Sequence, residues 1–275
     1  MGAHASLESS WSAVLQGALR VAGFFSLILV LTPVHVATRL LPGFSPLIMP
    51  RLFHRWLVRL MGFNVRVRGV MTDAPSTLFV ANHSSYLDVP VLGSVIPAAF
   101  VAKSEVARWP MIGRLAALQN TVFVERRAAC AAKQRDGMRE RLERGQSLIL
   151  FPEGTSSDGM RTLPFKSSLF SIAEAALPNG QPVTVQPVTI LCTELGGLPI
   201  SRAWRPYYAW YGDMTFMRHL WMVFCIGGFT VDVVFHPPVV AGGFDDRKAL
   251  TVHCHRQVAK GVEQCVTGRH TAAAK

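Results

Sequence analysis

Residues 76–88 read STLFVANHSSYLD. The apolar run at the start of this stretch predicts a buried strand near 77–82, and the serines that follow predict a helix over 85–96. From about residue 62 onward, short strands alternate with helical segments in the same way. Such alternation is typical of an α/β domain with a mostly parallel central sheet flanked by helices.

Further elements follow from the same patterns. Strands are expected near 64–69, 98–103, 120–125, 147–151, 183–190 and 229–236, and helices near 105–118, 127–144, 167–177 and 214–228. Gly145 marks the end of one helix, and Pro187 predicts a kink in a strand. The apolar helix at 214–228 fits either the core or a second interfacial element. We expect the α/β domain to cover residues 62–268, followed by a disordered Ala-rich tail at 269–275.

The first part of the chain, residues 1–61, is apolar and then basic. Residues 21–41 (VAGFFSLILVLTPVHVATRLL) have no charge between Arg20 and Arg39. About 20 residues suffice to cross a bilayer, so this segment is long enough to cross or enter one. Pro33 favours a bent or re-entrant helix. A signal peptide is the alternative, although no small-residue cleavage site follows promptly.

A basic amphipathic helix is predicted next, within residues 49–69. Its arginines repeat every four residues, at 51, 55 and 59, with apolar side chains between them. Basic clusters beside a membrane segment lie on the cytoplasmic side. We therefore expect the two segments to associate with the inner membrane at its cytoplasmic face. A soluble helix with a solvated arginine stripe is the alternative.

The composition favours membrane lipids as partners. Half of the 275 residues are hydrophobic, 16% are charged, and the formal net charge is +11. No run of Lys and Arg is interleaved with stacking aromatic side chains, so nucleic acid is not expected as a partner. The five cysteines form no Cys-x-x-Cys pair, which indicates reduced thiols. The run His253-Cys254-His255 has no partner ligands at useful spacing, so no metal site is expected.

His83 and Asp88, five residues apart, are the first candidate site. A histidine at a strand end and an aspartate in the first turn of the next helix can meet. The carboxylate then fixes one imidazole nitrogen and leaves the other as a general base. The alternative is structural, because Ser85-x-x-Asp88 resembles a capping box and an aspartate suits a helix N-terminus. The spacing alone leaves both readings open.

The turn Pro152-Glu153-Gly154-Thr155, which follows the strand at 147–151, is the second candidate site. Loops at the carboxyl ends of strands are where α/β folds bind ligands. Glu153 offers a hydrogen-bond acceptor, Gly154 lets a ligand approach the backbone, and Thr155 offers a hydroxyl. A plain Pro-x-Gly turn is the alternative.

Three cations stand at two other predicted strand ends. Arg126 and Arg127 follow VFVE, and Lys103 ends FVAK. Arginine recognises phosphate and carboxylate groups through its forked donors. Cations at a helix N-terminus are mildly unfavourable, which favours a bound anion near the two arginines. Solvated or salt-bridged surface positions are the alternative.

Five blocks occur in a fixed order along the chain: NHSSYLD, VAKSEVARWPMIG, NTVFVERR, FPEGTSS and VQPV. This ordered set, over roughly residues 60–240, resembles the PlsC-type glycerolipid acyltransferase family, the lysophosphatidate acyltransferases and their relatives. The N-terminal apolar and basic helices also look like the membrane-docking hairpin of that family.

The resemblance implies a role for each candidate residue. His83 would deprotonate an acceptor hydroxyl while Asp88 orients its ring. The acceptor oxygen would then attack an acyl thioester carried on acyl carrier protein or coenzyme A. The lysolipid acceptor would be bound by Lys103, Arg126, Glu153, Gly154 and Thr155. The resemblance implies no metal, no organic cofactor and no covalent enzyme intermediate.

One position departs from the family pattern. Many members have an arginine after the Glu-Gly-Thr turn, whereas this chain has Ser156. The run SSDGMRTLPFKSSLF looks like the branch of bacterial lyso-ornithine lipid acyltransferases, and Arg161 or Lys166 could replace the missing cation. The acceptor is therefore expected to be 1-acyl-sn-glycerol-3-phosphate or lyso-ornithine lipid. The alternatives to acyl transfer are hydrolysis of a thioester or ester by the same pair, and a non-catalytic membrane-binding module.

Overall fold

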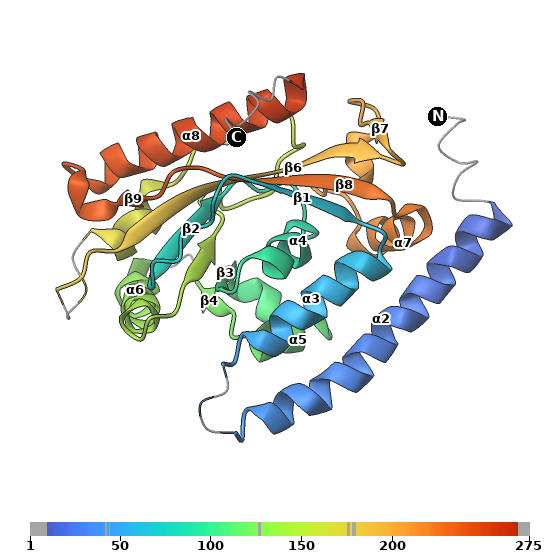
Figure 1. Ribbon diagram of the computed structural model, residues 1–275, viewed down its shortest axis with the longest axis horizontal. Coiled ribbons are helices and arrows are strands. Elements are labelled where there is room, and N and C mark those ends of the chain that lie inside the picture. Colours follow the sequence, from blue (N-terminus) through green and yellow to red (C-terminus); the bar gives the residue numbers. More distant parts are fainter. Residues whose placement is uncertain are drawn as a thin grey trace.

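The computed structural model describes residues 10–41, 43, 45–125, 128–174, 177 and 180–268, with backbone only for 128–134. Arg126, Arg127 and the tail 269–275 lie outside the described residues. Figure 1 shows a twisted sheet with helices on both faces and a long N-terminal helix along one side.

The sheet has the strand order β1-β8-β6-β2-β5-β3-β4, with β7 and β9 paired to β6. In chain order the strands are β1 (Asn64–Arg68), β2 (Thr77–Ala81), β3 (Ala99–Lys103), β4 (Val122–Val124), β5 (Leu148–Leu150), β6 (Thr184–Leu195), β7 (Leu198–Pro199), β8 (Phe229–Phe235) and β9 (Val239–Val240). The two shortest strands, β7 and β9, were not expected from the sequence. Within β6, Pro187 stays in register with Val80, and the register shift lies between Cys192 and Glu194.

Most neighbouring strands run parallel. The strand that leads to His83, β2, pairs in parallel with β5 and β6, and β3 pairs in parallel with β5 and β4. The antiparallel pairs all involve β6 with β7, β8 or β9 among the described strands. The predicted α/β fold with a mostly parallel sheet is therefore confirmed. Because β2 and β5 are neighbours, the loops that follow them lie side by side at one edge of the sheet.

The α-helices are α2 (Trp11–Thr38), α3 (Ile48–Leu60), α4 (Asp88–Val95), α5 (Ile112–Leu118), α6 (Ala128–Glu143), α7 (Phe216–Ile226) and α8 (Arg247–Thr267). The single helix expected over 105–118 is wrong, because Pro110 separates the 3₁₀ helix η1 (Ser104–Arg108) from α5. The helix expected over 167–177 is instead the 3₁₀ helix η2 (Ser167–Ala173). The long helix α8 was not predicted.

Two apolar clusters fill the two faces of the sheet. Helices α3, α4 and α7 contribute to one cluster, and α6, α8 and η2 contribute to the other. Successive side chains of β2 point to opposite faces of the sheet. Phe79 and Ala81 therefore belong to the first cluster, and Leu78 and Val80 belong to the second. A strand buried on both faces is a nearly continuous apolar run, as β2 is after its first residue, Thr77.

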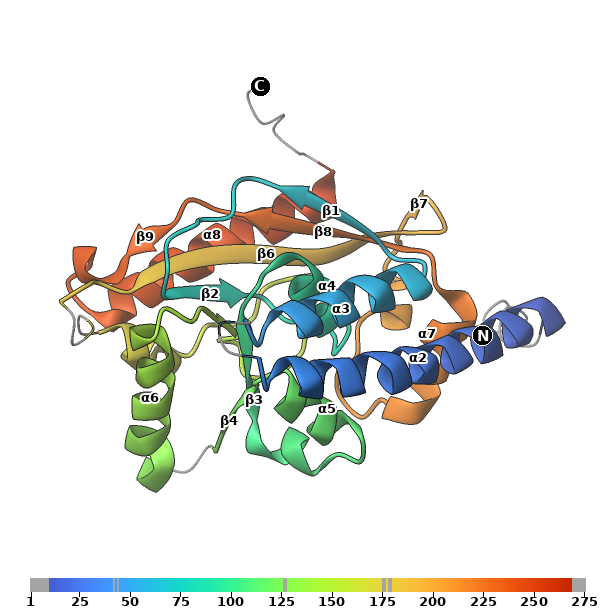
Figure 2. The ribbon, with the colours of Figure 1, turned by 60° about the horizontal axis from the view of Figure 1, so that its bottom comes forward.

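The predicted N-terminal pair of helices is present as α2 and α3. Both views show the two helices side by side (Figures 1 and 2), and α2 also packs against α7. Helix α2 is long and apolar enough to cross a membrane, with a mean hydropathy of 2.0 over an 18-residue window. Pro33 lies inside α2, which continues to Thr38. Most of the apolar side chains of α2 are exposed or half-buried.

Two arginines of the basic stripe bind the end of α4. Arg51 donates a hydrogen bond to the carbonyl of Val95 at 2.9 Å, and Arg55 donates to the carbonyl of Ser94 at 3.1 Å. The last carbonyl groups of a helix have no partners within the helix, and cations there also suit the helix dipole. These two arginines therefore cap the helix whose first residue is Asp88, although the Arg55 side chain is also exposed.

Candidate active site

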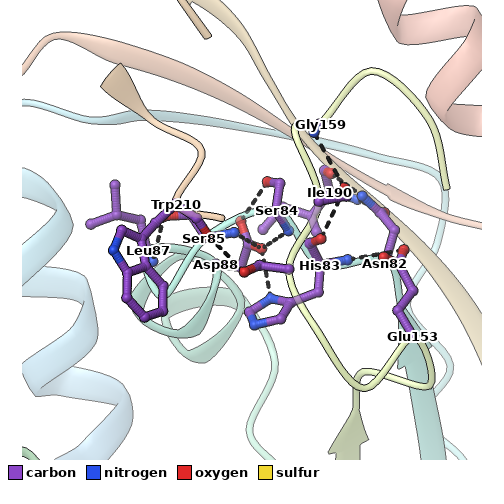
Figure 3. Close-up of polar contacts among 12 residues, drawn as sticks. Asn82, His83, Ser84, Ser85, Leu87, Asp88, Glu153, Gly159, Ile190 and Trp210 are labelled. Carbon is purple, nitrogen blue, oxygen red and sulfur yellow. Dashed lines mark hydrogen bonds and ion pairs between the residues drawn. The ribbon is translucent and has the colours of Figure 1, made fainter. Parts of the chain in front are cut away.

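His83 and Asp88 meet at the carboxyl edge of the sheet. His83 follows β2, Asp88 is the first residue of α4, and His83 Nδ1 lies 2.9 Å from Asp88 Oδ2 (Figure 3). A carboxylate oxygen only accepts, so Nδ1 carries the proton of the neutral ring and Nε2 carries the lone pair. Nε2 makes no hydrogen bond to the residues that the structure describes, which leaves it available to a substrate.

The Asp88 carboxylate is fully buried and accepts hydrogen bonds on both oxygens. Its Oδ2 also accepts the backbone N–H groups of Ser84 at 2.7 Å and Ser85 at 2.9 Å. Its Oδ1 accepts the hydroxyl of Tyr208 at 2.9 Å. The Ser85 hydroxyl accepts the N–H of Leu87 at 3.2 Å, not that of Asp88, so only the carboxylate half of the predicted capping box is formed. The carboxylate therefore caps the turn before α4 and orients the imidazole at the same time.

The imidazole of His83 is held on its face and through its backbone. The ring of Phe151 stacks on it with centroids 4.1 Å apart and planes inclined by 22°. The backbone N–H of His83 donates to Glu153 Oε1 at 3.3 Å, and its carbonyl accepts the N–H of Ser157 at 2.9 Å. The side chain is still 20% exposed, so a substrate can reach it.

Glu153 places a buried carboxyl group beside the dyad. The residue is 2% exposed, and its Oε2 has no hydrogen-bond partner among the described residues. Burial raises the pKa of the carboxyl to about 8, so the group is mainly protonated at neutral pH. A protonated carboxyl can donate one hydrogen bond. A ligand could therefore form the missing hydrogen bond to Glu153 Oε2.

Gly154 and Thr155 form the tip of the same turn. Gly154 has φ +68°, a left-handed conformation that favours glycine. The side chain of Lys166 lies over this glycine, because a Cβ at position 154 would be 2.8 Å from Lys166 Nζ. Thr155 and Lys166 are both exposed, and no carboxylate within the described residues forms an ion pair with Lys166. The turn thus brings a hydroxyl and an ammonium group close to Glu153.

The cations predicted at the other strand ends are placed only in part. Lys103 ends β3, two strands away from β2 in the sheet, and is half-buried. It lies opposite Val124, the last residue of β4. The structure therefore brings Lys103 to the same edge of the sheet as the dyad. Arg126 lies outside the described residues, and its role stays a prediction.

One segment of the site, residues 205–210, was not singled out from the sequence. The N–H of Trp210 donates to the carbonyl of Ser84 at 2.9 Å, and the hydroxyl of Ser156 donates to the carbonyl of Trp210 at 2.5 Å (Figure 3 shows Trp210 beside the dyad). With Tyr208 on Asp88, this segment binds both site loops. The aromatic run RPYYAWYG was the available signal, but it does not indicate which distant residues it contacts.

The site as a whole offers acid–base chemistry and a cation. It holds an oriented imidazole, a buried carboxyl that is mainly protonated, and an exposed ammonium group. No cluster of three or more His, Cys, Asp or Glu side chains able to hold a metal ion occurs in the part of the chain that the structure describes.

Comparison with known proteins agrees with this geometry. A family model with the description "Acyltransferase" matches residues 63–191, which include the dyad and the Glu-Gly-Thr turn. Over 224 residues the chain is 41% identical to the lyso-ornithine lipid O-acyltransferase of Brucella abortus, covering 80% of this chain and 84% of that protein. Over 183 residues it is 33% identical to the 1-acyl-sn-glycerol-3-phosphate acyltransferase of Neisseria gonorrhoeae, covering 63% and 64%.

A solved structure has the same fold. The crystal structure of the 1-acyl-sn-glycerophosphate acyltransferase PlsC from Thermotoga maritima matches with a TM-score of 0.64 and covers 95% of this chain and 98% of that one. At 23% identity this likeness establishes the fold alone. The sequence identity to acyltransferases over most of the chain establishes more, and it confirms the resemblance carried by the ordered blocks. The chain belongs to the PlsC-type acyltransferase family and is an acyltransferase.

Proposed function

We propose that the protein transfers a fatty acyl chain from acyl carrier protein or coenzyme A to the free hydroxyl of a lysolipid, with His83 as general base. The observation that carries the proposal is the 2.9 Å hydrogen bond between His83 Nδ1 and Asp88 Oδ2, which leaves Nε2 as the proton acceptor. No metal ion, organic cofactor or covalent enzyme intermediate takes part.

In the proposed reaction, Nε2 of His83 takes the proton of the acceptor hydroxyl as its oxygen attacks the thioester carbonyl carbon. The Asp88 carboxylate stabilises the imidazolium that forms. The C–S bond then breaks, the acyl group remains on the acceptor oxygen as an ester, and the imidazolium returns its proton to the leaving thiolate. A thioester is already activated, so the enzyme contributes mainly proximity and proton transfer.

We propose lyso-ornithine lipid as the preferred acceptor, with 1-acyl-sn-glycerol-3-phosphate as the second candidate. Ser156 replaces the arginine of the family pattern, and its hydroxyl is bound to the carbonyl of Trp210 within the protein. Relatives named as lyso-ornithine lipid O-acyltransferases are 35–41% identical to this chain, whereas the bacterial relatives named for the glycerolipid acceptor are 33% identical.

Both acceptors carry an anionic group several bonds from the reacting hydroxyl, a carboxylate in one and a phosphate in the other. The Lys166 ammonium over Gly154 supports binding of that group. Thr155 contributes a hydroxyl and Glu153 a carboxyl with an open oxygen. Lys103, together with Arg126, adds positive charge at the neighbouring strand ends. The Arg161 side chain is also exposed.

The N-terminal helices would dock this site on a membrane at its cytoplasmic face. Helix α2 exposes large apolar side chains along its length, including Trp11, Leu15, Leu19 and Leu29. It also packs lengthwise on α3 and α7 (Figure 2). A helix held along the domain in this way suits an in-plane position in the interface better than a transmembrane one. We therefore propose that α2 enters the bilayer without crossing it.

His83→Ala tests the mechanism. The full-length protein in lipid nanodiscs is given radiolabelled acyl-ACP or acyl-CoA and a lysolipid, and the acylated lipid and free fatty acid are measured separately. We expect acyl transfer to fall by about 10²- to 10⁴-fold, the usual contribution of a general base. Retained turnover in a folded His83→Ala protein would overturn the mechanism. Free fatty acid without acylated lipid, from the wild-type protein, would instead identify a hydrolase.

The acceptor is tested by offering lyso-ornithine lipid and 1-acyl-sn-glycerol-3-phosphate separately to the wild-type protein. We expect a higher kcat/KM for lyso-ornithine lipid. A higher value for the phosphate acceptor would overturn the proposed preference and leave the acyl-transfer mechanism intact. Acyl-ACP and acyl-CoA are compared in the same assay, which identifies the donor.

A further inference from the structure

The buried carboxylate of Asp88 has a partner from a distant part of the chain. Tyr208 OH donates to Asp88 Oδ1 at 2.9 Å, across a separation of 120 residues. The tyrosine is 1% exposed, and Asp88 is 0% exposed. Tyr208 also lies beyond residues 63–191, the range that the acyltransferase family model matches. Tyr208 therefore contacts the dyad from outside the range that the family model matches.

The hydroxyl of Tyr208 is held in place from several directions. Its ring packs against Phe63 and Phe229, with centroid distances of 6.2 Å and 5.6 Å. Two residues later, the backbone N–H of Trp210 donates to the carbonyl of Ser84, which lies inside the dyad loop. The tyrosine and the loop that carries Asp88 are thus fixed to each other through both backbone and side chain.

The two oxygens of Asp88 have different partners. Oδ2 accepts His83 Nδ1–H together with the N–H groups of Ser84 and Ser85, whereas Oδ1 accepts Tyr208 OH at 2.9 Å. The only other bond to Oδ1 among the described residues is a long one of 3.4 Å from the Ser84 hydroxyl. Without Tyr208, a buried carboxylate oxygen would lack a good donor, which is costly. The carboxylate could then rotate away from the imidazole.

We propose that Tyr208 is a positioning residue of the acyltransferase site, which locks the Asp88 carboxylate in the orientation that serves His83 and takes up part of its negative charge. The inference rests on the proposed acyl transfer by His83. Removal of the hydroxyl has two effects. The imidazole is less well oriented, and the carboxylate keeps more of its negative charge, so it stabilises the imidazolium more strongly. The first effect lowers kcat, and the second moves the acid limb of the pH profile to higher pH.

The other ionisable groups that face the dyad do not obscure this readout. Burial raises the pKa of Glu153 to about 8 and raises the pKa of the Cys192 thiol above its ordinary value, so both are mainly neutral below pH 7. Burial likewise raises the pKa of Tyr208, which keeps its phenol a donor over the working range. The charged group on the same segment, Arg205, donates to the carbonyl of Gly159.

Tyr208→Phe tests the inference, with Tyr86→Phe as the matched control. Tyr86 is a partly buried tyrosine whose hydroxyl lies 2.9 Å from His219 Nδ1 instead of Asp88. We expect Tyr208→Phe to lower kcat by about tenfold, the equivalent of one hydrogen bond to a charged group, with little change in KM for the lysolipid. The acid limb of kcat/KM moves to higher pH in this variant only. Tyr86→Phe keeps the wild-type kcat and pH profile.

A second replacement, 3-fluorotyrosine at position 208, keeps the ring and makes the hydroxyl a stronger donor. It moves the acid limb in the opposite direction, to lower pH. Wild-type kcat and pH profile in Tyr208→Phe, or equal losses in the two Tyr→Phe variants, would overturn the inference. If His83→Ala is inactive and Tyr208→Phe is wild type, the inference alone fails. If His83→Ala is active, the proposed function itself fails.

Discussion

Two loops at the same edge of the sheet use their polar groups differently. In the loop after β2, residues 82–88, the Asp88 carboxylate has donors on both oxygens and the backbone of His83 is bonded at its N–H and its carbonyl. In the loop after β5, residues 151–157, Glu153 Oε2 has no partner among the described residues and Thr155 is exposed.

This contrast indicates different tasks for the two loops: acid–base chemistry for the loop after β2 and substrate recognition for the loop after β5. A loop whose hydrogen bonds are satisfied internally fixes its catalytic groups before the substrate arrives, so little reorganisation is needed during the reaction. A loop that leaves a buried acceptor unsatisfied is completed by its ligand. We therefore expect changes at His83 and Asp88 in the first loop to act on kcat, and changes in the second loop to act on substrate binding or on stability.

Asp88→Asn has the largest expected effect. The amide has one acceptor oxygen where the carboxylate has two, so it cannot serve His83 Nδ1, the two backbone N–H groups and Tyr208 together. By analogy with the same change in serine proteases, kcat falls on the order of 10⁴-fold, or about 5 kcal/mol. Steady-state kinetics measure it, with KM for the lysolipid little changed. Wild-type kcat would reduce Asp88 to a helix cap and erase the contrast between the loops.

Glu153→Gln is expected to change how stability depends on pH. In wild type the folded pKa of about 8 exceeds the unfolded value of about 4.5. As pH rises between these values, the unfolded state loses the proton first, so the stability of the wild-type protein falls. The variant lacks this loss, which amounts to about 2 kcal/mol after partial relaxation around the charge.

Chemical denaturation of the two proteins at about pH 5 and pH 8 measures the difference. Glu174→Gln is the control, because Glu174 is exposed and pairs with Arg247 on the surface. Parallel stability curves for wild type and Glu153→Gln would show that the carboxyl is ionised in the folded protein.

Lys166→Met tests the cation over the turn. Methionine keeps much of the unbranched stem and removes the charge, so KM for the lysolipid is expected to rise about tenfold, or about 1.4 kcal/mol, with kcat within about twofold. Lys248→Met, which removes an exposed cation at the start of α8, is the matched control and leaves KM unchanged. A loss in kcat with constant KM would place Lys166 in the chemistry instead of in recognition.

Thr155→Val has the smallest expected effect. The substitution keeps the shape of the side chain and removes one exposed hydroxyl, so KM rises about threefold, or about 0.6 kcal/mol. Thr155→Ser retains the hydroxyl and should restore the wild-type KM. A larger loss that serine does not restore would point to a backbone role for the turn.

The sequence predicts the parts of the site whose contacts are local. His83 and Asp88 are five residues apart, so a strand followed by a helix is enough to bring them together. The two loops lie together because β2 and β5 are neighbours, which is a property of the whole sheet that no short pattern contains. Tyr208 is 120 residues from Asp88, and its role is visible only once the chain is folded.

The missed and misread helices have identifiable causes. The buried face of α8 mixes the aliphatic Leu250, Val258 and Val262 with small and polar side chains, which are Thr251, Cys254, Gly261 and Cys265. Their spacing of three to four residues was helical, but their apolar signal was weak. In the segment 105–118, Pro110 was a readable signal for a break, because proline lacks the N–H that a helix interior needs.

The capping of α4 by α3 has a practical consequence for protein production. Residues 1–61 have the composition of a removable anchor, yet Arg51 and Arg55 bind the end of the helix that begins with Asp88, and His54 fills the space over Gly93. A shortened protein without the N-terminal helices would lose these contacts at the far end of α4, the helix that carries the proposed general-base pair's Asp88. A water-soluble enzyme should instead be engineered by replacing the exposed apolar side chains of α2 while α3 is kept intact.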